Sequence, residues 1–113
     1  MPASRPLVKG TLDALVLKAL AWEPMHGFEI TTWLELRSDG AIGVQDSALY
    51  QALHRLEERG YVAGEWGITD NNQRARYYRL TRAGRAHLAE ETAQLVRYAE
   101  AVTAILTSPP RTA

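Results

Sequence analysis

Apolar residues in the first half of the chain recur with the period of an α-helix. Over residues 47–59 they follow the i, i+3, i+4, i+7 spacing that marks one buried helix face. That face consists of Leu49, Ala52, Leu53 and Leu56. Residues 11–22 are apolar nearly all round, which indicates a helix buried on more than one side, and residues 26–37 carry a narrower apolar face. We therefore predict three helices over these ranges.

A strand pattern follows the third helix. Residues 61–66 and 76–80 are rich in aromatic side chains, which strands favour. The segment between them contains Thr69-Asp70-Asn71-Asn72-Gln73, a run of turn-forming residues. We expect a β-hairpin whose tip and second strand carry Arg74 and Arg76.

The last predicted element is one long helix over residues 82–106, with Thr81 as its cap. Its apolar and small residues alternate spacings of four and three, a heptad seam that needs a covering partner. No other stripe in the chain is long enough to cover it, so we predict a homodimer in which the first helix also takes part. The predicted interface is Leu12, Val16, Leu88, Leu95, Ala99, Val102 and Leu106.

Three helices, a two-stranded hairpin and a long helix form the layout of a winged helix-turn-helix protein, a mainly α (α+β) fold. We expect residues 1–81 to form the DNA-binding part, residues 82–108 the dimerisation helix packed with it as one unit, and residues 109–113 a frayed tail. In this fold the third helix enters the major groove, and the hairpin, or wing, touches the backbone or the minor groove. The predicted DNA contacts are Lys9, Ser47, Tyr50, Gln51, His54, Arg55, Asn72, Arg74 and Arg76.

The distribution of charge supports the wing as a DNA contact. The net charge is zero, with 13 basic and 13 acidic residues. Residues 74–85 nevertheless contain five arginines and no acid. A locally basic segment in a neutral chain is typical of a surface that meets phosphates, and arginine suits both phosphate and base-edge recognition.

Consecutive motifs resemble the PadR family of transcriptional regulators, and specifically its small subfamily with a single C-terminal helix. They are Lys9-Gly10-Thr11-Leu12-Asp13, Met25-His26-Gly27-Phe28-Glu29-Ile30, residues 48–60, Glu65-Trp66-Gly67, Arg76-Tyr77-Tyr78 and Leu80-Thr81-Arg82-Ala83-Gly84. The resemblance covers residues 7–106 and implies a homodimeric DNA-binding protein, usually a repressor that binds a pseudo-palindromic operator.

The chain departs from the family pattern in two ways. Gln51 stands where the family usually has proline, and its amide is able to read adenine. Ser47 and Ala48 replace a glycine and a hydroxyl residue, so DNA contacts of the family at residue 48 do not carry over.

Several function classes find no support in the sequence. Cysteine is absent, and the three histidines lie 28 and 33 residues apart, so we expect no metal site. Ser47 and His54 lie about two turns apart on one helix, too far for a nucleophile and its base. No glycine-rich phosphate loop is present. We therefore predict that the protein is not an enzyme and that it binds no cofactor.

Location and partners follow from similar arguments. No uncharged run exceeds the ten residues 101–110, and the N-terminal residues lack an apolar signal core, so we expect a cytoplasmic protein without a membrane span.

The resemblance also implies a planar aromatic effector, for which Trp22 and Tyr98 are the candidate pocket. Alternatively, both rings simply fill the dimer interface. We interpret Trp33 and Trp66, together with Trp22, as core residues. The rival function is a winged-helix ligand-binding or scaffold protein that no longer binds DNA.

Overall fold

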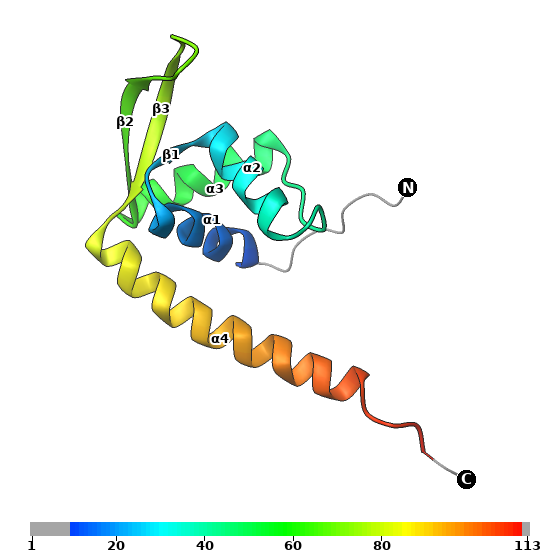
Figure 1. Ribbon diagram of the computed structural model, residues 1–113. Coiled ribbons are helices and arrows are strands. Elements are labelled where there is room, and N and C mark those ends of the chain that lie inside the picture. Colours follow the sequence, from blue (N-terminus) through cyan, green and yellow to red (C-terminus); the bar gives the residue numbers. More distant parts are fainter. Residues whose placement is uncertain (1–9, 112–113) are drawn as a thin grey trace.

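The computed structural model describes residues 10–111, which form four helices and three strands (Figure 1). In chain order they are α1 (Thr11–Trp22), β1 (Met25–His26), α2 (Gly27–Arg37), α3 (Asp46–Glu58), β2 (Val62–Ile68), β3 (Arg74–Leu80) and α4 (Arg82–Leu106). The predicted fold, a winged helix-turn-helix with a long C-terminal helix, is confirmed. Of the predicted tail, residues 109–111 have no regular secondary structure, and residues 112–113 lie outside the described part.

The core forms where α1, α2 and α3 meet the sheet. Every member of the apolar stripe predicted for the third helix is buried, as the i, i+3, i+4, i+7 spacing requires. α1 contributes Val16, Leu17, Ala19 and Leu20, and it contacts α2, α3, α4 and β3. Burial on several sides explains why its sequence is apolar nearly all round.

The sheet has three strands rather than the two predicted, in the order β1-β3-β2. β2 and β3 form the expected antiparallel hairpin, with registers from Val62↔Leu80 to Ile68↔Arg74. β1 adds to the free edge of β3 through the pairs Met25↔Tyr78 and His26↔Tyr77. Two residues are too short a run to show an alternating pattern, so this strand has no signal of its own in the sequence.

Local chemistry sets the ends of the helices. The side chain of Thr81 accepts a hydrogen bond from the backbone N–H of Gly84 at 3.0 Å, which confirms the predicted cap of α4. His26, predicted as the first residue of the second helix, is the residue that caps α2, in a reciprocal pair of hydrogen bonds with Glu29. α3 begins and ends one residue earlier than predicted, and both long strands extend further toward the tip of the hairpin.

α4 gives the protomer an elongated shape. The radius of gyration is 16.5 Å, compared with about 13 Å for a compact chain of this length. In Figure 1 the first part of α4 lies beside α1, and the second part extends away from the other elements. A single chain therefore leaves the second half of this helix uncovered. Within residues 10–111, no helix combines the length and the apolar character that crossing a bilayer needs.

Candidate nucleic-acid interface

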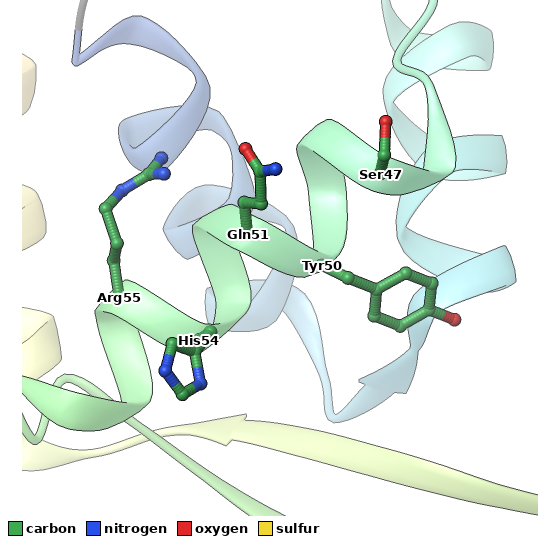
Figure 2. Close-up of a pocket in the computed structure, with 5 residues that line it drawn as sticks. All are labelled: Ser47, Tyr50, Gln51, His54 and Arg55. Atoms are coloured by element: carbon green, nitrogen blue, oxygen red, sulfur yellow. The ribbon is translucent and has the colours of Figure 1, made fainter.

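Five of the predicted DNA contacts come together on one side of α3. Ser47, Tyr50, Gln51, His54 and Arg55 line a shallow hollow on the exposed face of this helix (Figure 2). All five side chains are exposed, opposite the buried leucine stripe. A helix with one buried face and one face of hydrogen-bonding side chains is suited to contact base edges in a major groove.

Tyr50 lies differently from its neighbours in the hollow. Figure 2 shows its ring pointing away from Gln51 and Arg55, toward the start of α2. A Cβ on Gly27 would lie 2.5 Å from the Tyr50 hydroxyl oxygen and 3.0 Å from Cζ. With glycine at residue 27 the ring takes this position without a shift, so two of the motifs noted in the sequence meet in one contact between α2 and α3. The hydroxyl is placed at the edge of the hollow rather than at its centre.

Arg55 makes an ion pair that the sequence did not predict. Its Nη2 donates to Asp13 Oδ1 at 2.6 Å, and its Nε donates to Asp13 Oδ2 at 3.5 Å. Asp13 belongs to the first turn of α1, and its side chain is 16% exposed against 43% for Arg55. The hydrogen bond to Asp13 raises the pKa of the Arg55 guanidinium above its ordinary value. The guanidinium of Arg55 is therefore paired with a carboxylate at this edge of the hollow.

Two arginines of the wing, Arg74 and Arg76, were predicted to contact DNA, and they differ in their acidic partners. Within the described residues, Arg74 makes no ion pair, and its guanidinium lies 4.3 Å from the ring centroid of Trp66. Trp66 is 57% exposed, which corrects the interpretation of this residue as core. A tryptophan with an arginine stacked on it, on an exposed strand, forms a surface that is both cationic and apolar.

Arg76, also predicted to contact DNA, has an acidic partner in this structure. Its side chain crosses Gly64, where any Cβ would lie 2.5 Å from Nε, and it ends in an ion pair with Glu57 of α3. The hydrogen bond to Glu57 raises the pKa of the Arg76 guanidinium. Arg76 thus links the wing to α3, and much of its charge is compensated.

Two predicted DNA contacts remain, Asn72 and Lys9. Asn72 is exposed in the turn between β2 and β3, where its φ of 61° is a left-handed conformation that asparagine tolerates well. Lys9 lies outside the described residues. The prediction for Lys9 therefore stays untested.

The predicted dimer residues fall into two groups. Val16 is 0% exposed in the core of the protomer, so it is removed from the predicted interface, and Leu88 is also buried against that core. Leu12 and Leu95 are half-buried. Ala99, Val102 and Leu106 are exposed on the uncovered half of α4, beside exposed Val96 and Ile105. The heptad pattern did not distinguish its first turns, which the protomer itself covers, from its last ones.

Trp22 and Tyr98, the candidate effector pocket, are both exposed, which also corrects the interpretation of Trp22 as core. The Arg37 guanidinium lies 5.0 Å from the Trp22 ring centroid and 5.1 Å from that of Trp33, so Arg37 stacks against both indoles. No aromatic contact among the described residues joins Trp22 to Tyr98. A pocket that used both would need a second copy of the chain.

The sequence patterns did not identify three residues of this surface. Asp13 and Glu57 hold arginines, and pairing over 42 or 19 residues leaves no local signal. Trp66 shares a strand face with buried Val62, so period-two alternation predicts burial for both. Trp66 is exposed because the hairpin extends beyond the core. In the part of the chain that the structure describes, no cluster of three or more histidine, aspartate or glutamate side chains could hold a metal ion.

Comparisons with known proteins agree with this architecture. A family model described as the transcriptional regulator PadR-like family matches residues 16–90. A transcriptional regulator from Mycobacterium tuberculosis is 38% identical over 87 residues, which cover 77% of this chain and 78% of the relative.

Solved structures are also similar to this chain. The crystal structure of a PadR family transcriptional regulator from Eggerthella lenta DSM 2243 is 33% identical and has a TM-score of 0.71, with 89% of this chain and 86% of that chain covered. A protein from Streptococcus mutans UA159 has a TM-score of 0.80 over 98% of this chain and 100% of that chain; at 23% identity it supports the fold alone. The family model spans more than half of the chain, so this chain belongs to the PadR-like family of transcriptional regulators.

Proposed function

We propose that two copies of this chain bind a pseudo-palindromic operator in cytoplasmic DNA and repress transcription there. The observation that carries the proposal is the hollow on α3, where five exposed polar or aromatic side chains face away from the core beside an arginine-bearing wing. In a winged helix-turn-helix protein these two elements meet the DNA. A two-fold protein dimer favours a two-fold related pair of half-sites.

The contacts divide by their chemistry. Gln51, Ser47 and His54 offer hydrogen-bonding groups on the exposed face of α3, which suits base edges in the major groove. Arg74 and Asn72 lie on the wing, which suits the phosphate backbone or the minor groove, and Trp66 adds an apolar contact beside Arg74. Lys9 is a further candidate phosphate contact on the basis of the sequence.

The second copy of the chain is proposed to cover the far half of α4. Val96, Tyr98, Val102, Ile105 and Leu106 are exposed there in the protomer. Large apolar side chains gathered on one projecting helix favour association, because burying them removes apolar surface from water. We accordingly keep residues 1–81 as the DNA-binding part and residues 82–108 as the dimerisation helix, with Leu12, Leu95 and Ala99 at the interface.

An effector is proposed at the same interface. Trp22 ends α1 and Tyr98 lies on α4, and both rings are exposed. Two aromatic rings brought together by dimerisation would suit a planar aromatic compound. The alternative is that the two rings fill the interface and leave no room for a ligand.

A selection from random duplex DNA, with sequencing of the retained pool, tests the proposed function. We expect two related half-sites about 10 base pairs apart or a multiple of this. Since Arg55 and Arg76 are paired with acids, we count Arg74 and Lys9 as the phosphate contacts of each protomer. Four contacts in a dimer predict a slope of about −4 for log affinity against log salt.

Two variants separate the proposed roles. Arg74→Ala should weaken binding to all sequences and make the slope shallower by about 2, because two phosphate contacts are lost in the dimer. Gln51→Ala should leave the slope unchanged and change the preferred sequence. If wild-type protein retains no duplex at 50 mM salt, as the rival ligand-binding or scaffold function requires, the proposed function is wrong.

A further inference from the structure

The contact between Asp13 and Arg55 joins the first helix to one end of the candidate DNA surface. Asp13 is the acidic residue in the first turn of α1, and Arg55 lies in the last turn of α3. Both oxygens of the carboxylate accept hydrogen bonds from the guanidinium, at 2.6 and 3.5 Å. A forked pair of this kind fixes the orientation of the guanidinium plane as well as its position.

The fork leaves part of the guanidinium available. Arginine has five N–H donors, and the contacts with Asp13 use one on Nε and one on Nη2. Arg55 remains 43% exposed and lines the hollow with Gln51. Figure 2 shows the two side chains extending from the same side of α3. The remaining donors of Arg55 therefore belong to an exposed side chain that lines the hollow.

The carboxylate has two opposing effects on DNA binding. It compensates the charge of Arg55, which lowers the attraction to phosphates that is the same for every sequence. It also restricts the rotamers of the Arg55 side chain, so less side-chain entropy is lost when Arg55 meets a fixed acceptor. The first effect weakens non-specific binding, and the second favours binding to one defined arrangement of acceptors. Both raise the ratio of specific to non-specific affinity.

We propose that Asp13 is a positioning residue that sets sequence selectivity by holding Arg55 for base-edge contacts and away from phosphates. This inference rests on the proposed function. It assigns different tasks to two arginines of the same surface: Arg55, held by a carboxylate, reads bases, and Arg74, which stacks on Trp66 without an acidic partner among the described residues, binds backbone. Base contacts specify a sequence, whereas phosphate contacts position the protein on any duplex.

Asp13→Asn tests the inference, because it keeps the volume of the side chain and removes its charge. Each protomer then has a released cation, so the salt slope should become steeper by about 2 per dimer. Affinity for an unrelated duplex should rise. The ratio of specific to non-specific affinity should fall at least about fivefold, the lower end of what one good arginine–base contact contributes.

A double-mutant cycle isolates the action through Arg55. In an Arg55→Gln background, Asp13→Asn should change neither the salt slope nor the selectivity ratio, because there is no guanidinium left to hold. Arg55→Lys keeps the charge but lacks the fork, so it should also lose selectivity even if Asp13→Asn does not fold. Asp46→Asn is the matched charge control: this exposed acid at the start of α3 makes no ion pair among the described residues, and its loss should leave the ratio unchanged.

Different outcomes would contradict the role of Asp13 and the proposed function. A selectivity ratio that stays within twofold in Asp13→Asn, or that falls equally in the Arg55→Gln background, overturns the inference and leaves the proposed function intact. If wild-type protein binds no selected duplex, the proposed function fails and the inference falls with it. Thermal unfolding of each variant shows whether a change in DNA binding follows from lost stability, a change that would move both affinities together.

Discussion

Gly84→Ala is expected to destabilise the protein, although alanine is the better helix former. Gly84 lies in the first turn of α4, where this helix leaves the sheet. A Cβ at this position would overlap the carbonyl oxygen of Tyr61 and lie 2.8 Å from its carbonyl carbon. The obstacle is backbone, so a side-chain rotation cannot relieve it. That carbonyl also accepts a hydrogen bond from the N–H of Thr81 at 3.1 Å, so moving it disturbs the cap of α4.

The magnitude follows from three contributions. Overpacking by one methyl group typically costs about 1–3 kcal/mol, and weakening the hydrogen bond from Thr81 to Tyr61 costs about 1 kcal/mol more. The higher helix propensity of alanine offsets about 1 kcal/mol of this cost, because alanine loses less backbone entropy than glycine on folding. The free energy of unfolding should therefore fall by about 1–3 kcal/mol.

Urea unfolding followed by tryptophan fluorescence measures this change, at a fixed protomer concentration because a dimer is stabilised by mass action. Ala86→Gly, at an exposed position of the same helix, is the matched control, and it should cost about 1 kcal/mol through helix propensity alone. If Gly84→Ala is more stable than wild type by about that amount, the close approach of α4 to Tyr61 does not exist and the reasoning is refuted.

Two further predictions concern the second copy of the chain and its effector. Val102→Asp should weaken dimerisation by more than about 100-fold in analytical ultracentrifugation, since an interface carboxylate would lose its hydration. Ala104→Asp, on the opposite side of α4, should not weaken dimerisation. Equal behaviour of the two variants would argue against an interface along the heptad seam. In a fluorescence screen, a planar aromatic effector should bind with a dissociation constant below about 100 μM, less tightly to Tyr98→Ala, and should lower DNA affinity. Ligands that bind without changing DNA affinity would disprove the effector role.

Residue 51 illustrates how far periodicity alone leads. At 100° per residue, the leucine stripe of α3 determines which side chains face away from it, so the sequence is sufficient to place Ser47, Gln51 and His54 on the exposed face. In the structure these three side chains are exposed, as predicted. Periodicity is informative here because both faces belong to one helix, and the relation between them is set by the helix geometry itself.

The sequence by itself determined the order of the elements, the buried stripe of α3, the cap at Thr81 and the family motifs, because each depends on residues a few positions apart. Tertiary structure alone decided which arginines are held by acids, that β1 joins the sheet, and that Trp66 is exposed while Val16 is enclosed. These features depend on the angles at which helices and strands pack. Such angles bring together residues that lie far apart in the chain, such as Asp13 and Arg55 at 42 positions, and leave no periodic trace in the chain.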